Sequence, residues 1–261
     1  MRSGFTKSYI ALAAVVIIVA GGISAQADLS DPTISVYYGF EGDGDVVKDG
    51  SVNGNDGMIV GNVVRDEGVY GKSIVLETDS WIDMNGPEFT NGPVEGFTIA
   101  VWVNHTGSSS PQTLLDAIGT DHGSGLFHME IRSGGFRFFH RDGNNAEVFN
   151  INPGPVIEAN TWVHFAGTYD SESNEVKTYI DGEETHSAAG SGNPCSDNWG
   201  VTAGIGHHKN DRWFNGMLDE YFIFNRAVSA SEITDIMNGV LTSVEPADKL
   251  TTTWGNIKSH R

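Results

Sequence analysis

Residues 162–170 read WVHFAGTYD, and this stretch decides the fold class. Successive side chains of a β-strand point to opposite faces, and the stretch has two different faces when it is read with that period. One face carries Val163, Phe165, Gly167 and Tyr169, and the other carries Trp162, His164, Ala166 and Thr168. Residues 176–180 form another such run and end at Asp181-Gly182, a pair typical of hairpin turns. The region predicts antiparallel strands.

Similar runs recur along the chain at residues 34–38, 97–103, 126–131, 136–140 and 218–224. The run at 126–131 separates its side chains most clearly, because large apolar residues alternate with polar ones. Phe127, Met129 and Ile131 fall on one face, and His128, Glu130 and Arg132 fall on the other. The chain contains 33 glycines, which supply turns between short strands. This pattern predicts an all-β fold, a two-sheet antiparallel sandwich or jelly roll.

One short helix is expected near the C-terminal end. Ser229 and Glu232 have the spacing of a capping box. Apolar residues at helical spacing follow, namely Ile233, Ile236 and Met237. Gly239 supplies a stop signal.

The first 27 residues have the order of a secretory signal peptide. Arg2 and Lys7 precede an apolar run at 10–20, and small residues at 25–27 form an A-x-A cleavage site. We expect cleavage after Ala27, a single domain over 28–243 and a loosely ordered tail over 244–261. A secreted or periplasmic protein follows from this interpretation, with no stable membrane insertion after signal removal. The alternative is an uncleaved membrane anchor, although the run is short for a span of about 20 residues.

Charge and cysteine content exclude several function classes. The chain has 34 acidic and 15 basic residues and a formal net charge of −19. Such a chain repels phosphate backbones and anionic membranes, so no nucleic-acid partner is expected. Cys195 is the only cysteine, which rules out an intramolecular disulfide. It lies in a Gly/Pro/Asn-rich segment at 190–200 without an evident catalytic partner, so we do not expect a catalytic thiol.

Five segments in order resemble the LamG-like jelly-roll family of the concanavalin A-like lectin/glucanase superfamily. They are YGFEG at 38–42 with DGSVNGNDG at 49–57, GVYGKSI at 68–74, FTIAVWV at 97–103, residues 162–170 continuing to 179–182, and FNGMLDEY at 214–221 with FNRAVS at 224–229. The resemblance implies two antiparallel sheets packed face to face. The cysteine pair that is frequent in the family is absent here. The superfamily contains lectins, adhesion modules, hydrolases and lyases, so the resemblance defines the fold better than the function.

Calcium is the expected metal, with two places to consider. An oxygen-rich stretch includes Glu41, Asp43, Asp45, Asp49, Asn53, Asn55 and Asp56. It forms either a calcium loop or a turn stabilised by Asx side chains, and it fails as an EF-hand because position twelve is Val60. The resemblance implies a different site, in which Glu41 and Asp219 bind a structural calcium together with a backbone carbonyl near Gly71. The alternative is that Asp219 and Glu220 face solvent or pair with Arg226.

A glycan-binding surface is the second candidate site, because sugars bind to aromatic faces and planar polar groups. The residues expected there are Arg132, His140, Arg141, Asp142, Asn144, Trp199, His207 and Trp213. His208, Asp211 and Arg212 lie in the same late loops, and Arg137 and Asn145 lie on or beside the central hairpin. Trp213 could instead belong to the core. His207 and His208 are neighbours that would point to opposite faces of a strand, which is poor geometry for a two-histidine metal site.

No catalytic residues are predicted. The chain has neither an E-x-D-x-E strand, which hydrolases of the superfamily often carry, nor a G-x-S-x-G elbow. His128, His140, Arg132 and Arg141 could be imagined in a polysaccharide lyase, but no motif supports that role. We therefore expect a recognition module that binds an extracellular glycan or protein. The alternatives are a polysaccharide-degrading enzyme and a structural envelope protein.

Overall fold

The computed structural model describes residues 28–107, 111–118, 126–195, 203–208 and 211–241. The predicted signal segment, the whole predicted tail and Trp199 lie outside the described residues. No helix in the described ranges is long and apolar enough to cross a membrane.

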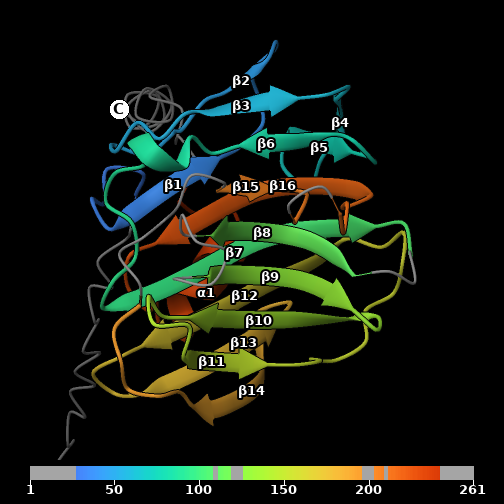
Figure 1. The fold of residues 1–261 in the computed structure, drawn as a ribbon. Coiled ribbons are helices and arrows are strands. Elements are labelled where there is room, and N and C mark those ends of the chain that lie inside the picture. Colours follow the sequence, from blue (N-terminus) through green and yellow to red (C-terminus); the bar gives the residue numbers. More distant parts are fainter. Residues whose placement is uncertain (1–27, 108–110, 119–125, 196–202, 209–210, 242–261) are drawn as a thin grey trace, which may run out of the picture.

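Two antiparallel sheets form the molecule and lie in two layers (Figure 1). Sheet I has the order β14-β13-β12-β7-β16-β5-β4, with β1 also paired to β16, and sheet II has the order β11-β10-β9-β8-β15-β6-β3-β2. The strands of sheet I are β1 Ile34–Tyr38, β4 Val64–Glu67, β5 Lys72–Leu76, β7 Gly96–His105, β12 Val163–Asp170, β13 Glu175–Ile180, β14 Glu183–Ala189 and β16 Gly216–Phe224. Those of sheet II are β2 Val46–Val47, β3 Gly57–Val60, β6 Trp81–Asp83, β8 Gln112–Ile118, β9 Leu126–Arg132, β10 Gly135–Arg141, β11 Glu147–Ile151 and β15 Gly204–Ile205. A short 3-10 turn, Gly86–Glu88, precedes β7.

The main core lies between the two sheets and confirms the predicted alternation. Phe165 and Tyr169 of β12 face it from sheet I, and Phe127, Met129 and Phe138 face it from sheet II. The polar residues of β9 therefore lie on the outer face of sheet II. This places His128 and Glu130 away from the core while the strand itself stays fixed by its apolar face.

The helix α1, Ala230–Met237, begins and ends as predicted. Ser229 and Glu232 form both hydrogen bonds of the capping box, and Gly239 adopts the left-handed conformation with a φ of 66°. Ile233 and Ile236 of the helix join a second apolar cluster that includes Ala166 and Phe222. The helix thus covers part of the outer face of sheet I, and no α-helix among the described residues covers the outer face of sheet II.

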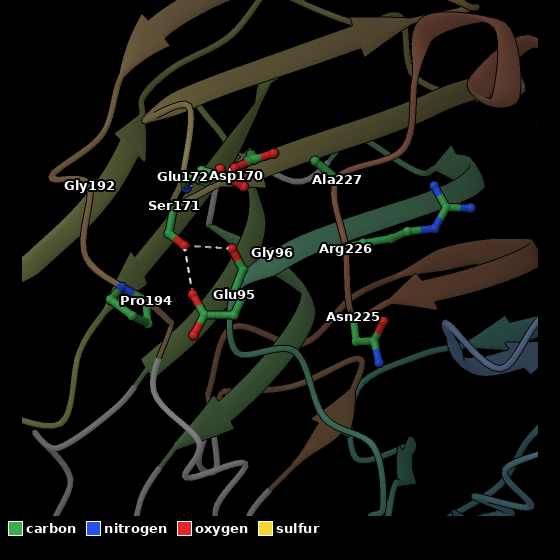
Figure 2. Close-up of a pocket in the computed structure, with 10 residues that line it drawn as sticks. All are labelled: Glu95, Gly96, Asp170, Ser171, Glu172, Gly192, Pro194, Asn225, Arg226 and Ala227. Carbon is green, nitrogen blue, oxygen red and sulfur yellow. Dashed lines mark hydrogen bonds between the residues drawn. The ribbon is translucent and has the colours of Figure 1, made fainter.

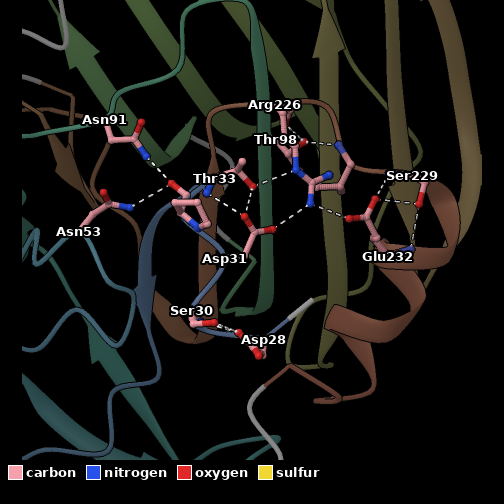
Figure 3. Close-up of polar contacts among 12 residues, drawn as sticks. Asp28, Ser30, Asp31, Thr33, Asn53, Asn91, Thr98, Arg226, Ser229 and Glu232 are labelled. Atoms are coloured by element: carbon pink, nitrogen blue, oxygen red, sulfur yellow. Dashed lines mark hydrogen bonds and ion pairs between the residues drawn. The ribbon is translucent and has the colours of Figure 1, made fainter. Parts of the chain in front are cut away.

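Arg226 ties the first described residues to this helix (Figure 3). Its guanidinium group contacts Asp31 at 3.1 Å and Glu232 at 2.6 Å, and its Nε donates to the Thr33 hydroxyl at 2.9 Å. The backbone carbonyl of Arg226 accepts a hydrogen bond from the Thr98 hydroxyl at 2.7 Å. Through its side chain and its backbone carbonyl, Arg226 therefore joins the first described residues, helix α1 and strand β7.

Candidate functional site

The outer face of sheet II gathers polar residues in one cross-strand row. In the strand register, Phe139 lies opposite His128, His128 opposite Asp116, and Asp116 opposite Gly204. Residues opposite each other in adjacent strands bring their side chains to about 5 Å. The antiparallel pairing of β10, β9, β8 and β15 thus places these side chains side by side.

Asp116, His128 and His208 form a compact cluster on this row. Oδ1 of Asp116 lies 3.0 Å from Nδ1 of His128 and 2.9 Å from Nδ1 of His208. The candidate ligand atoms of the three residues lie within 4.8 Å of one another. The Asp116 and His128 side chains are each 1% exposed, and the His208 side chain is 17% exposed. The cluster is therefore buried beneath His208, which reaches the surface.

Glu130, two residues after His128, forms the second half of the network. Its carboxylate lies 2.9 Å from Nε2 of His128 and 3.1 Å from the guanidinium group of Arg212. Arg132 and Arg137 each contact the same carboxylate at 3.2 Å. One carboxylate without solvent exposure thus orients three guanidinium groups and one imidazole.

The protonation of this network follows from its contacts. Burial alone would raise the pKa of Glu130, but His128, Arg132 and Arg212 lower it to about 2. Burial also opposes ionisation of Asp116, yet hydrogen bonds from His128 and His208 outweigh it and lower the pKa of this carboxyl. For His128, burial alone would lower the pKa, and the two carboxylates raise it. Both acids are therefore ionised at neutral pH.

The backbone pairing of His208 with Asp211 brings His208 and Arg212 into the network. The backbones of His208 and Asp211 exchange two hydrogen bonds of 2.9 and 3.0 Å. Arg212 follows with a φ of 52°, in the left-handed region that non-glycine residues rarely adopt. Its carbonyl accepts a hydrogen bond of 2.9 Å from the backbone of Thr113 in β8. Strained backbone conformations persist only where the surrounding structure holds them, and they are frequent at functional sites. The left-handed conformation of Arg212 therefore marks a position where the direction of the side chain matters.

Two guanidinium groups, those of Arg137 and Arg141, lie over one aromatic ring. The Cζ atom of Arg137 lies 4.1 Å from the centroid of Phe139, and that of Arg141 lies 5.1 Å from it. Cation–π contacts of this kind fix the orientation of the arginines. Together with His128, His208 and Arg212, these residues line a pocket of about 180 Å³. We refer to the surface formed by Arg132, Arg137, Arg141 and Arg212 as the arginine face.

The structure brings some of the predicted glycan-binding residues to this face and not others. Arg132 and Arg141 lie on it, and Asp142 and Asn144 lie at the adjoining turn, where the Asp142 carboxylate accepts the backbone N–H of Asn144 at 2.8 Å. The expectation is wrong for His140, which has no solvent exposure and whose ring lies 4.1 Å from that of Phe127 in the core. Successive side chains of strand β10 alternate between its two faces, so His140 points into the core, whereas its neighbours Phe139 and Arg141 point outward.

His207 and Trp213 lie in an aromatic stack beside the cluster. The His207 ring is 4.0 Å from that of Trp81 and 5.5 Å from that of Trp213. His207 is 7% exposed and Trp213 is half-buried. His208 turns the other way, toward Asp116, as expected for neighbours on an extended chain. The second histidine of the cluster is His128 from β9 and not His207.

The sequence did not predict Asp116 as a residue of the site, and neither Glu130 nor Phe139 was expected there. Strand β8 reads QTLLDAI, with a bulge between Thr113 and Leu115, so it lacks clean alternation. A signal was nevertheless present, because an acidic residue inside an apolar strand must have a polar partner when it is buried. His208 is distant from Asp116 by 92 residues, and no local pattern connects them.

The structure also brings together the three residues of the expected calcium site. Asp219 Oδ2 accepts the backbone N–H groups of Val69 and Tyr70 at 2.8 and 2.9 Å, and Glu41 accepts that of Lys72 at 3.0 Å. Gly71, with a φ of 67°, lies directly against the Glu41 carboxylate, so that a side chain there would collide with it. Two carboxylates thus lie on either side of one tight turn.

The electrostatics of this turn fit a cation. Burial, with the charge of Glu41 as a lesser contribution, raises the pKa of Asp219 to about 6 despite three backbone N–H donors. Hard oxygen donors of this kind are those that calcium prefers. The alternative for this region is wrong, because Asp219 and Glu220 are 0% and 2% exposed and Arg226 pairs with Asp31 and Glu232 instead.

The oxygen-rich stretch at 49–57 is a turn stabilised by Asx side chains. Both carboxylate oxygens of Asp49 accept hydrogen bonds, from the backbones of Tyr37, Ser51 and Asn55 and from the Ser51 hydroxyl, at 2.7 to 2.9 Å. The Asn55 side-chain amide donates to the backbone carbonyls of Ser35 and Thr90 at 2.7 and 3.0 Å. These groups are occupied by the chain itself, which favours the turn over a calcium loop.

Two larger pockets lie elsewhere. One of about 590 Å³ is lined by Glu95, Asp170, Glu172 and Arg226 among others (Figure 2), and there the Ser171 hydroxyl donates to Glu95. The other, of about 410 Å³, includes Asn104, Asn160 and Asn215. Neither contains a cluster of buried ionised side chains comparable to that of the arginine face. The arginine face is therefore the stronger candidate despite its smaller pocket.

Solved structures with the same fold include several binding domains. Domain 4 of an extracellular arabinanase from Geobacillus stearothermophilus, in complex with arabinotriose, is 20% identical, with a TM-score of 0.65 over 78% of this chain and 98% of that domain. The binding domain of Paraclostridial mosquitocidal protein 1 is 18% identical, with a TM-score of 0.63 over 80% of this chain and 52% of that one.

The binding domain of botulinum neurotoxin DC, in complex with SialylT, is 16% identical, with a TM-score of 0.61 over 80% of this chain and 52% of that one. This chain therefore spans about half the length of the toxin domains that it matches. No curated protein matches the chain.

A family model of the laminin G type matches residues 76–234, from strand β5 to helix α1. The matched region contains the central strands of both sheets and every residue of the arginine face. The jelly roll predicted from the alternating runs and the five ordered segments is confirmed by this match and by the two observed sheets. The chain belongs to the concanavalin A-like lectin/glucanase superfamily.

Proposed function

We propose that the protein is an exported recognition module that binds an acidic glycan on the arginine face. The observation that carries this proposal is the gathering of four of the chain's eight arginines on one face, in a chain of net charge −19. Most of such a molecule repels polyanions. A local surplus of guanidinium groups therefore indicates a ligand that brings negative charge of its own.

The arginines are arranged for recognition of planar anions. Guanidinium groups bind carboxylates and sulfates through parallel hydrogen bonds, and the strength of such pairs depends on orientation. Phe139 and Glu130 fix that orientation for Arg137, and Phe139 fixes it for Arg141. A pocket of about 180 Å³ is smaller than the pockets of drug-sized ligands, about 300–1,000 Å³. It suits one charged sugar of a chain that extends along the open sheet.

Burial of the two carboxylates favours binding over glycoside hydrolysis on this face. Hydrolysis needs a pair of acids that flank the glycosidic bond. Glu130 has no solvent exposure, and Asp116 is 1% exposed beneath His208. Neither carboxylate can reach a sugar, so we assign them to the support of the arginines and histidines.

Binding to a panel of acidic and neutral oligosaccharides tests the proposal. We expect affinity for acidic members, weaker at high salt because screening reduces the attraction. Arg141→Ala and Arg132→Ala should each reduce affinity by about 10-fold, which corresponds to about 1.4 kcal/mol. Arg65→Ala, on strand β4 of sheet I, is the matched control and should bind as the parent does.

Binding of neutral glycans alone, or equal affinity of Arg141→Ala and Arg65→Ala, would contradict the acidic-glycan proposal. Release of shortened or unsaturated sugars during the assay would support the enzyme alternative. If the protein captures a protein partner and Arg141→Ala does not weaken that binding, the recognition surface lies elsewhere on the molecule.

Calcium is part of the proposed function as a structural ion held by Glu41 and Asp219 with a carbonyl near Gly71. The ion would neutralise two neighbouring carboxylates and join the region after β1 to β16, in a chain that has no disulfide. Adding calcium to chelator-stripped protein should raise the melting temperature. An unchanged melting temperature would exclude this site.

Export is proposed from the order of charged, apolar and small residues over 1–27. It agrees with a ligand outside the cytoplasm, since acidic polysaccharides occur at cell surfaces and in extracellular matrices. Determination of the N-terminus of the protein purified from its own cells is the direct check, with Asp28 as the expected first residue.

A further inference from the structure

We infer that Asp116, His128 and His208 bind a zinc-type divalent metal ion at the floor of the arginine face. The site is separate from the proposed calcium site, and it stands whether or not a glycan binds above it. Two imidazole nitrogens and one carboxylate oxygen are the donor set of open, three-ligand zinc sites.

The contacts of His128 give the first reason. Each ring nitrogen faces a carboxylate oxygen, Nδ1 facing Asp116 at 3.0 Å and Nε2 facing Glu130 at 2.9 Å. A neutral imidazole has one proton, so one of these contacts would bring two lone pairs together. Either a second proton or a metal ion must lie on the unprotonated side. The contact of His208 with Asp116 favours the metal ion.

That contact is the one made by His208. Its Nδ1 lies 2.9 Å from the same Oδ1 atom of Asp116 that His128 approaches. Ligand atoms about 2.1 Å from a tetrahedral ion lie about 3.4 Å from one another. The observed separations of 2.9 and 3.0 Å are within a few tenths of an ångström of that value. Three side chains, from β8, β9 and the bridge between His208 and Asp211, thus bring their ligand atoms within 4.8 Å of one another.

Asp116 supplies an independent indication, because its Oδ2 atom is buried without a hydrogen-bond partner among the described residues. A buried carboxylate oxygen without a partner costs free energy. Carboxylates bind ions through one or both oxygens, so a metal ion that both oxygens of Asp116 bind would also satisfy the orphaned Oδ2 atom.

Glu130 has the position of a supporting carboxylate. Histidines that bind zinc commonly donate their other ring N–H to a carboxylate, which fixes the ring orientation. Glu130 accepts from Nε2 of His128 at 2.9 Å and is held in turn by Arg132, Arg137 and Arg212. The arginines therefore serve the metal site as well as the surface. His208, at 17% exposure, leaves a route from the pocket to the ion.

Zinc titration of chelator-stripped protein in excess calcium tests the inference, because calcium occupies the hard-oxygen site at Glu41 and Asp219. We expect one Zn²⁺ per chain by calorimetry and elemental analysis. Cobalt should give the visible absorption of a tetrahedral site. His208→Ala should lose at least about 100-fold in affinity, while circular dichroism shows an unchanged fold, because this ligand lies near the surface.

His186→Ala is the matched control, since His186 is an exposed histidine on strand β14 and should not affect uptake. A folded Glu130→Gln protein should bind zinc about 10- to 100-fold more weakly. Absence of zinc uptake by the folded parent overturns the inference, and a doubly protonated His128 ring would then explain the contacts. Equal affinity of His208→Ala and the parent would also overturn it, since the ion would then lie elsewhere.

Discussion

At the scale of single residues, Gly71 shows how one backbone position supports the proposed calcium site. It has a φ of 67°, and a Cβ atom there would meet the carboxylate of Glu41. Gly44 has a φ of 86° but has no neighbour within 4 Å of a built Cβ atom. A substitution at Gly44 therefore has only the energetic cost of the left-handed conformation, whereas one at Gly71 has the additional cost of moving Glu41.

We expect Gly44→Ala to lower the free energy of unfolding by about 1–2 kcal/mol, the usual cost of a left-handed non-glycine residue. Gly71→Ala should lose more and should also lose the stabilisation by calcium, because Glu41 is displaced. Urea unfolding with and without calcium measures both quantities. If the two variants respond equally to calcium, Gly71 has no role in binding the ion.

His164 links a single residue to the stability of the molecule at acid pH. Burial lowers its pKa from 6.5 to about 3, and neither ring nitrogen has a hydrogen-bond partner among the described residues. The folded state holds this ring neutral, whereas the unfolded chain takes up a proton below pH 6.5. The free energy of unfolding therefore falls as the pH falls from about 6.5 toward 3.

We expect a slope of about 1.4 kcal/mol per pH unit from this residue at most. His164→Phe keeps a ring against Trp102 and removes the titrating group. As the pH is lowered, the free energy of unfolding of the parent should fall relative to that of His164→Phe. Parallel pH profiles of the two proteins would show that His164 does not carry the effect.

At the scale of elements, Arg226 joins three parts of the chain that are far apart in sequence. Its contacts with Asp31, Thr33 and Glu232 connect the first described residues with helix α1 (Figure 3). The capping box predicted the helix, but nothing in the local pattern indicated this connection. Residues 28–33 and the helix should therefore lose stability together when Arg226 is removed.

We predict that Arg226→Ala lowers the free energy of unfolding by about 1–3 kcal/mol, because charged hydrogen bonds between half-buried groups are lost. Hydrogen exchange should increase in helix α1 and in residues 28–33. Lys177→Ala, which removes a surface pair with Glu175 at 2.7 Å, should cost less than about 1 kcal/mol. An equal effect of both variants would mean that the Arg226 network is only a surface feature.

The sequence predicted the long strands and the helix but only half of the candidate site. Strands β7, β9, β10, β12 and β16 alternate clearly, and each one was expected within a few residues of its observed bounds. Strand β8 has a bulge and an apolar run, and β14, EETHSAA, is an exposed edge strand with little apolar character, so neither was expected. Asp116 lies on strand β8, so it was missed because the strand itself was not predicted.

At the scale of the whole molecule, the two sheets divide the roles. The outer face of sheet I is closed by helix α1, whereas the outer face of sheet II holds the arginines above a buried layer of acids and histidines. A strongly acidic protein thus has four of its eight arginines on one face. This division agrees with the proposed recognition role, in which the face opposite helix α1 binds the ligand.

The most direct test of this account is a map of the residues that an acidic oligosaccharide perturbs in nuclear magnetic resonance spectra. We predict shifts at the side-chain N–H groups of Arg137, Arg141 and Arg212 and along strands β9 and β10, with no shifts around Glu95 or Asn160 in the two larger pockets. Perturbation confined to either of those pockets, or none by any acidic glycan, would contradict the assignment of the arginine face as the recognition surface.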